Sequence, residues 1–163
     1  MKHPKLTSLL IVLILMVIST RALIADTYLG AGINYMVSGP NPPSVAVIDA
    51  KWEGEGNYPW FLAINYRDDY AIWDYPVDQH AVFSGGKRIF KLDITPDLYG
   101  YVDFGLSIPS ELSVANSSWL LFHERFGLDY KGVRLELSHS SNAGLAPPNE
   151  GETALILSYK VSF

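Results

Sequence analysis

The sequence contains no cysteine, and its basic residues are few. Without cysteine, a disulfide framework, a zinc–thiolate site and a cysteine nucleophile are all excluded. Lys and Arg number 12 against 17 Asp and Glu, which gives a net charge of −5. A chain this acidic offers no basic stripe to the phosphates of a nucleic acid, so nucleic-acid binding is excluded as well.

Long apolar runs are also missing, with one exception near the N-terminus. Residues 9–18 are nearly all apolar; a basic segment at 1–5 precedes them, and the small residues Ala22 and Ala25 follow. This order is that of a secretory signal peptide, and the run is shorter than the roughly 20 apolar residues of a permanent membrane helix. We predict a signal peptide over 1–25, cleaved after Ala22 or Ala25, and one mature domain over 26–163.

Helical periodicity is absent from this mature part, which is rich in aromatic and β-branched residues broken by Gly, Pro, Asn and Asp. Alternation with a period of two predicts eight strands, over 27–37, 44–53, 58–69, 80–94, 97–108, 118–129, 132–141 and 152–163. The connections near 54–57, 95–96 and 130–131 are short, whereas those near 38–43, 70–79, 109–117 and 142–151 are long. This pattern is typical of an all-β fold, an eight-stranded antiparallel transmembrane β-barrel of the outer-membrane type.

The alternation also predicts which residues face outward. In the strand 97–108, Val102, Phe104 and Leu106 share an apolar face. A soluble lipocalin-like barrel with an apolar lumen would show the same alternation. Charges on the polar faces favour the membrane barrel, because the burial of each unpaired ion in a lipocalin pocket would cost on the order of several kcal/mol. These charges are Arg67, Asp103, Arg125, Arg134, Glu136 and Lys160. A last strand that ends in Phe163 also resembles the assembly signal of outer-membrane proteins.

A candidate catalytic pair lies in the last hairpin. His139 and Ser141 are two residues apart on one strand, so their side chains point to the same side. A histidine beside a serine hydroxyl is the minimum for a general base that activates a nucleophile. Parity places both on the face of Leu137, which we assign to lipid, and a polar group there suggests function. Ser140 is the rival nucleophile, but its parity points it to the lumen.

The last hairpin contains the stretch His139–Gly144, followed by Pro148-Asn149-Glu150-Gly151 and Glu152. This segment resembles the C-terminal signature of the lipid A 3-O-deacylases of Gram-negative outer membranes, the PagL family. That signature reads H-x-S-N-A-G, then P-N-x-G and a Glu. The resemblance implies an eight-stranded barrel with its site on the outer wall. It further implies Ser141 as the nucleophile and His139 as the base, with no metal or cofactor. The oxyanion donors would be Asn142, Gly144 and Asn149.

The acid of the triad is where the sequence departs from this pattern. The family's Glu lies fourteen residues after the His, at the position of Thr153 in this chain. Glu152 is the favoured acid, provided that a bulge at the barrel rim turns it outward. Glu124 is the alternative. A two-residue turn at Tyr130-Lys131 would place it diagonally across from His139.

With this resemblance, we predict a carboxylic ester hydrolase of the outer membrane, whose substrate is lipid A of lipopolysaccharide and whose surroundings are outer-membrane lipid. It would remove the ester-linked 3-hydroxyacyl chain from the 3-position. A small structural or adhesive barrel without enzyme activity is the alternative. Of the remaining histidines, His123 has luminal parity and His80 is expected in solvent at a loop edge.

Overall fold

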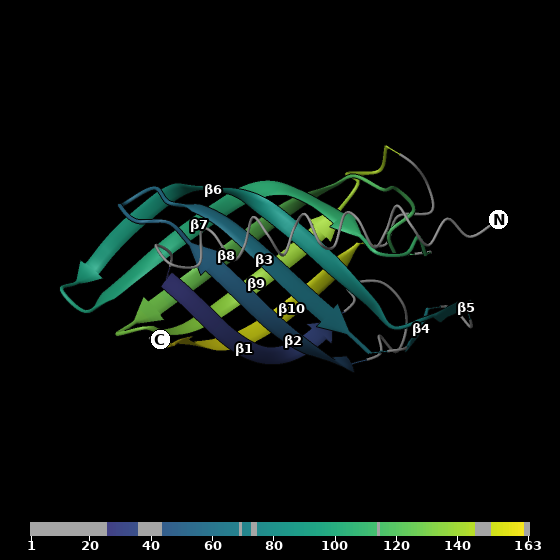
Figure 1. Ribbon diagram of the computed structural model, residues 1–163, viewed down its shortest axis with the longest axis horizontal. Coiled ribbons are helices and arrows are strands. Elements are labelled where there is room, and N and C mark those ends of the chain that lie inside the picture. Colours follow the sequence, from purple (N-terminus) through teal and green to yellow (C-terminus); the bar gives the residue numbers. More distant parts are fainter. Residues whose placement is uncertain are drawn as a thin grey trace.

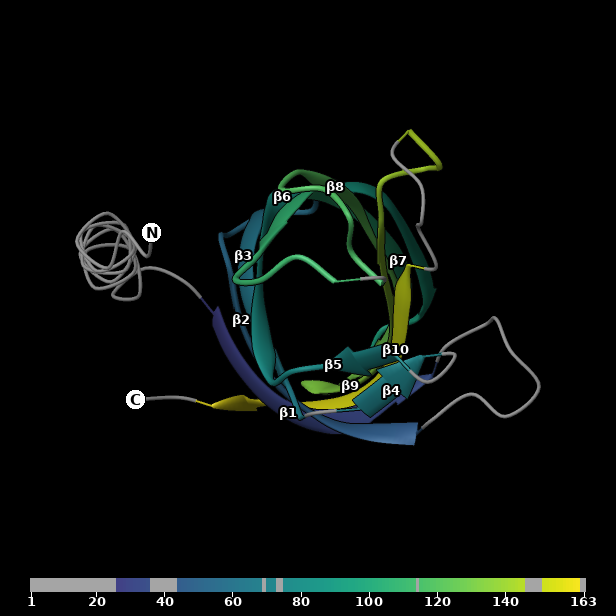
Figure 2. The ribbon, with the colours of Figure 1, turned by 90° about the vertical axis from the view of Figure 1, so that its right-hand side faces the viewer.

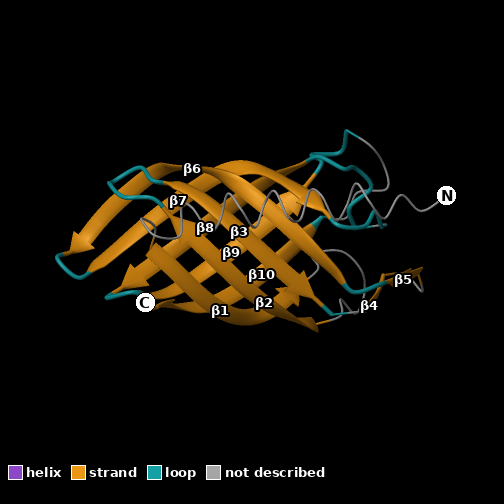
Figure 3. Cartoon of the chain, viewed as in Figure 1, coloured by secondary structure: helices purple, strands orange, loops and turns teal. Residues whose placement is uncertain are grey.

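A computed structural model of the chain describes residues 26–35, 44–68, 70–72, 75–113, 115–145 and 151–161. The predicted signal peptide and its cleavage site lie outside these residues. The described part is built from β-strands (Figures 1 and 3), and none of it forms a helix long and apolar enough to cross a membrane. The strands are β1 (Asp26–Tyr35), β2 (Ser44–Glu53), β3 (Trp60–Arg67), β4 (Tyr70–Ile72), β5 (Tyr75–Val77), β6 (His80–Thr95), β7 (Leu98–Pro109), β8 (Leu121–Tyr130), β9 (Val133–Ser141) and β10 (Glu152–Val161).

Eight of these strands close into one antiparallel barrel, in the order β1-β10-β9-β8-β7-β6-β3-β2. The end-on view in Figure 2 shows the ring that they form. Closure leaves no unpaired sheet edge, and strands in hydrocarbon need every backbone polar group to be paired. The eight-stranded barrel predicted from the alternation is confirmed. One element was not predicted: β4 and β5 form a separate two-stranded hairpin within the long 70–79 connection.

The short turns and the long loops lie at opposite ends of the barrel. β10 ends on the short-turn side, and the β4–β5 hairpin lies at the other end (Figure 1). The turn between β8 and β9 uses Lys131 and Gly132, with φ of 53° and 83°. Two positive φ values identify a type I′ hairpin turn. The sequence prediction placed this turn one residue earlier, at Tyr130-Lys131. That was wrong, because Gly132 is the residue that adopts the left-handed conformation most easily.

The outer wall is apolar, as predicted. Leu135 in β9, Leu157 in β10 and Leu106 in β7 are each about half exposed at their surface, at 47%, 59% and 46%. Contiguous exposed apolar side chains over several strands are costly in water and favourable in a bilayer. The outward faces predicted for these strands are therefore confirmed.

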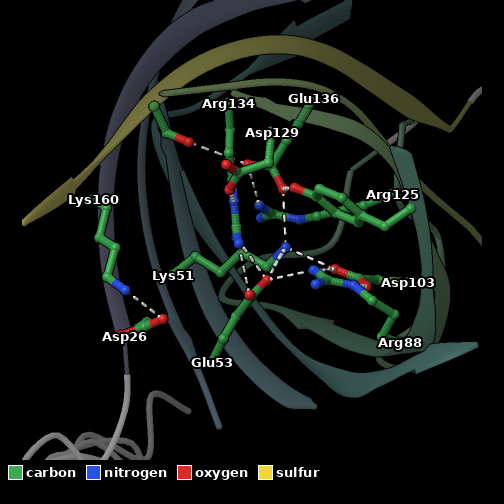
Figure 4. Close-up of polar contacts among 12 residues, drawn as sticks. Asp26, Lys51, Glu53, Arg88, Asp103, Arg125, Asp129, Arg134, Glu136 and Lys160 are labelled. Carbon is green, nitrogen blue, oxygen red and sulfur yellow. Dashed lines mark hydrogen bonds and ion pairs between the residues drawn. The ribbon is translucent and has the colours of Figure 1, made fainter. Parts of the chain in front are cut away.

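The lumen is filled by paired charges instead of an apolar pocket (Figure 4). Nζ of Lys51 lies 2.8 Å from Glu53, 2.7 Å from Asp103 and 2.9 Å from Glu136, and its side chain is fully buried. Arg125 and Arg134 are likewise buried and paired with carboxylates. A buried ion is tolerated when its partners are this close. Five of the six charges predicted to face inward are buried there, and the sixth, Lys160, pairs with Asp26 at the rim.

Candidate active site

His139 and Ser141 stand at the long-loop end of β9, on its outward face. The burial of β9 alternates strictly: Ser138 and Ser140 are buried, whereas His139 and Ser141 are half-buried. This is the arrangement that the parity argument predicted. Both polar side chains lie on the same apolar outer wall as Leu137.

A hydroxyl group on the neighbouring strand holds the His139 ring. Nδ1 of His139 lies 2.8 Å from Oγ1 of Thr153 in β10, and the two residues are direct partners in the strand register. A threonine hydroxyl can both donate and accept. When it accepts from the Nδ1–H, the other ring nitrogen is left unprotonated and open to chemistry. Among the described residues, no side chain or backbone group forms a hydrogen bond with Nε2 of His139. Thr153 therefore occupies the place that a triad acid would take.

Gly151 forms the floor between the two candidate catalytic side chains. A Cβ added to this glycine would stand 2.9 Å from Cε1 of His139 and 3.1 Å from Cβ of Ser141. The ring edge and the serine therefore share one small space, which a side chain at 151 would fill. The backbone of Gly151 also has a φ of 68°, a conformation that favours glycine. Sequence reasoning did not single out Gly151 for this role, although its place in the P-N-x-G segment marked a position that needs glycine.

Glu124 of β8 lies on the other side of His139. The turn at Lys131-Gly132 makes the two residues direct register partners, not diagonal neighbours as predicted from the sequence. Direct partners have Cβ atoms about 4.5–5.5 Å apart. Glu124 is half-buried on the outward face. His139 therefore has a hydroxyl on one side and a carboxylate on the other.

Glu152, the acid favoured from the sequence, lies on the inner side of the wall. The register between β9 and β10 pairs Thr153 with His139 and Glu152 with Ser140 without a shift. The bulge that would turn Glu152 outward is therefore not formed, and strict alternation sends its side chain into the lumen. There it is fully buried, and its carboxylate contacts Arg67, His80 and Asn116. The structure does not bring Glu152 to His139.

The predicted oxyanion donors lie in the turn that follows Ser141. Nδ2 of Asn142 donates to Oγ of Ser117 at 3.0 Å, and the Gly144 N–H donates to Oδ1 of Asn142 at 2.9 Å. The turn is closed by the Leu145 N–H, which donates to the Asn142 carbonyl oxygen at 3.1 Å. Asn142 directly follows the serine, and Gly144 lies two residues further on. The side-chain amide of Asn142 is engaged with Ser117 in the connection between β7 and β8, and the Gly144 N–H is engaged within the turn. Asn149 lies outside the described residues.

A second serine–histidine pair lies inside the barrel. Oγ of Ser140 is 2.8 Å from Nδ1 of His123, and both residues are fully buried. Nε2 of His123 accepts a hydrogen bond from Nε of Arg125 at 3.1 Å. A guanidinium only donates, so the ring proton of His123 must be on Nδ1, where it is donated to Ser140. His123 therefore cannot take the serine proton. Its predicted luminal place is confirmed, whereas His80, expected in solvent, is buried against Glu152.

An apolar groove of about 420 Å³ runs along the same outer wall as the pair. It follows a row of register partners from β10 to β6 that lies two residues from the row through His139 on β7 to β10, and three residues from it on β6, where the register shifts. These residues are Leu155, Leu137, Phe126, Val102 and Phe90. Gly100 deepens the groove because it places no side chain over the wall. The groove thus begins two residues along β9 from the histidine, a distance of about 7 Å toward the short-turn end.

No family model matches the sequence, and no curated protein matches it either. Among solved structures, the fold is similar to that of the outer membrane enzyme PagL, with a TM-score of 0.60 and 18% identity, over 85% of this chain and 100% of that chain. The barrel is an outer-membrane-type fold. Two further matches have lower TM-scores: Ail, the attachment invasion locus protein of Yersinia pestis, at 0.48 (10% identity, 84% of this chain and 97% of that one), and a de novo designed transmembrane β-barrel at 0.47 (14%, 85% and 97%).

Proposed function

We propose that this chain is an outer-membrane esterase that removes the 3-O-linked 3-hydroxyacyl chain from lipid A. The observation that carries the proposal is the position of His139 and Ser141: they share a glycine-floored niche on the hydrocarbon-facing wall, at its long-loop rim. An enzyme for water-soluble esters has no reason to place its nucleophile there. A lipid whose ester lies just below its headgroup reaches it by lateral diffusion.

The proposed reaction follows the serine-hydrolase pattern. Nε2 of His139 removes the proton of Ser141, whose Oγ attacks the ester carbonyl carbon. The tetrahedral intermediate collapses as the imidazolium returns the proton to the departing sugar oxygen, which leaves an acyl group on Ser141. Water, activated by the same nitrogen, then attacks this acyl-enzyme and releases a 3-hydroxy fatty acid. The resemblance to the family signature implies that Asn142, Gly144 and Asn149 would stabilise the oxyanion.

Thr153 takes the orienting role in this proposal. With the ring proton on Nδ1 donated to Oγ1 of Thr153, Nε2 is left unprotonated and turned away from β10. A neutral hydroxyl fixes this orientation but adds little to the stability of the imidazolium. Glu124, directly across from the ring on β8, supplies the negative charge on the other side. The roles of a triad acid are thereby divided between two residues.

The groove supports an acyl chain as the bound group. The row of register partners through His139 reaches Trp60, the first residue of β3 at its short-turn end. Rows of partners therefore cross the wall from the long-loop rim toward the opposite rim. A chain laid in the parallel groove below His139 runs from the rim into the bilayer, which is the path of a lipid acyl chain. Buried chain would contribute about 0.8 kcal/mol per methylene.

The predicted signal peptide and the barrel fold together support a location in the outer membrane, with the long loops on the outside. Lipopolysaccharide occupies the outer leaflet at that side. The deacylated lipid A would lack one 3-hydroxyacyl chain.

The test is to express the full chain in a Gram-negative host and weigh its lipid A by mass spectrometry. We expect a new species that lacks one 3-hydroxyacyl chain, absent with Ser141→Ala and with His139→Asn. An unchanged lipid A beside a folded, outer-membrane-located barrel would refute the deacylase and favour the adhesive barrel. Binding of cells to host-matrix proteins, measured with the same strains, would then be the positive signal of that alternative.

A further inference from the structure

Glu152 is held by three partners from distant parts of the barrel. Its carboxylate forms an ion pair with Arg67 of β3 and a hydrogen bond with the side chain of Asn116 in the β7–β8 connection. Oε1 also lies 3.1 Å from Nε2 of His80 in β6. In the barrel, β10 is paired only with β1 and β9. The contacts of Glu152 therefore reach across the lumen and tie the start of β10 to the opposite wall.

The residues on either side of Glu152 both lie next to the candidate catalytic histidine. Thr153 holds Nδ1 of the ring, and Gly151 forms the floor against Cε1 of the same ring. The Gly151 N–H also donates to the carbonyl oxygen of Ala115 at 3.1 Å, in the connection that supplies Asn116. Two points of that connection thus fix the three-residue segment 151–153.

The other luminal charges offer a contrast. Glu136 of β9 is just as buried and is paired with Lys51 and Arg125, but its neighbours along the strand are Leu135 and Leu137, which line the groove. A buried ion pair is often replaceable by apolar residues without loss of stability. Apolar residues could therefore fill the lumen in place of the Glu152 cluster. What distinguishes this cluster is its position directly behind the candidate site.

We propose that Glu152 is a positioning residue that anchors the start of β10 from inside the barrel, so that Gly151 and Thr153 hold His139 in its reactive orientation. The proposal rests on the proposed esterase function for its effect on rate, but not for its effect on the ring. Glu152 thus acts through the backbone of its neighbours and not by contact with the histidine.

The test compares Glu152→Ala with Glu152→Gln, and both with the matched control Glu136→Ala, all in detergent-refolded full-length barrel. The first readout is the ¹⁵N NMR spectrum of histidine-labelled protein, in which His139 is assigned by His139→Asn. We expect the wild-type ring to be mainly protonated on Nδ1. Glu152→Ala should shift His139 toward the ordinary Nε2-protonated form, and Glu152→Gln, which can still accept from Asn116, should largely preserve the wild-type signal.

The second readout is ester hydrolysis, with kcat and KM measured separately. Displacement of the ring should lower kcat of Glu152→Ala by about 10- to 100-fold and leave KM within about threefold, because the groove is untouched. Glu136→Ala should leave both the His139 signal and kcat near wild type in the folded fraction. Where Glu152→Ala does not fold, Asn116→Ala tests the same anchor without leaving a charge unpaired, and an intermediate shift is expected.

An unchanged His139 signal in folded Glu152→Ala or Asn116→Ala would overturn the proposal, as would an equal shift in Glu136→Ala. A shifted ring signal in a barrel that hydrolyses no lipid A ester, even as wild type, would refute the esterase and leave the anchor standing.

Discussion

Two serine–histidine pairs lie on opposite faces of the barrel wall: Ser140 of β9 with His123 of β8 faces the lumen, and Ser141 with His139, both of β9, faces outward. Inside, Ser140 and His123 are 2.8 Å apart, yet Arg125 forces the ring proton onto the nitrogen that faces the serine. Outside, the ring of His139 is held by Thr153 through Nδ1, so its other nitrogen is the one available for chemistry. The inner pair is thus chemically idle despite its short distance, and the partners of the histidine matter more than the serine–histidine separation.

The largest expected effect comes from replacing each of the two serines, in turn, by alanine. Ser141→Ala should lower deacylation by at least about 10³-fold, because it removes the nucleophile. Ser140→Ala removes a buried hydroxyl from the inner pair and should keep activity within about threefold in the folded barrel. Measurement of released 3-hydroxy fatty acid from lipid A checks both. If only Ser140→Ala lost activity, the inner pair and not the outer pair would be the catalytic one.

A smaller effect is expected from the floor of the niche. Gly151→Ala adds a methyl group 2.9 Å from the His139 ring, and displacement of the ring by about 1 Å should cost about 10²-fold in kcat. Gly56→Ala is the matched control, since Gly56 also has a positive φ but no atom lies within 4 Å of the added carbon. Both should lose roughly 1 kcal/mol of stability to backbone strain. Equal kcat in the two variants would contradict the assigned role of Gly151.

The next test concerns the two residues on either side of the His139 ring in the outer pair, Thr153 and Glu124. Thr153→Val keeps the shape but removes the acceptor for Nδ1, so kcat should fall by about 10- to 100-fold, less than the roughly 10⁴-fold that loss of a triad carboxylate costs. Thr153→Ser should retain most of the activity. Glu124→Gln tests the other neighbour of the ring and should lower kcat by less than about tenfold. If Glu124→Gln proved far more damaging than Thr153→Val, Glu124 would be the true acid.

The smallest expected effect lies in the groove. Gly100→Leu should occupy the groove and displace about two methylenes of a bound chain, which at about 0.8 kcal/mol each corresponds to a KM roughly tenfold higher. Gly85→Leu is the control, because Gly85 lines a different apolar groove, near Leu62 and Leu106. KM values for long- and short-chain esters check the prediction, and a rise in both variants would argue against a specific chain path.

Strand parity could be predicted from the sequence because alternation of polar and apolar residues is a local property. Alternation alone was enough to assign His139 and Ser141 to the outer face and Ser140 to the lumen. The exact partners of His139 depend on one turn, and an error of one residue at Gly132 moved Glu124 from a diagonal to a direct neighbour. Glu152 was misjudged for a different reason. Arg67 lies 85 positions away from it in the chain, and no local pattern reveals a contact made by closure of the barrel.

The central claim is that Ser141, activated by His139 on the lipid-facing wall, is the nucleophile. A long-chain alkyl fluorophosphonate in mixed micelles phosphonylates an activated serine, and tandem mass spectrometry of the C-terminal peptide separates Ser140 from Ser141. We predict modification of Ser141 in the wild type, none in His139→Asn and none of Ser140 in either. Modification of Ser140, or none at all in a folded barrel that still deacylates lipid A, would contradict the account.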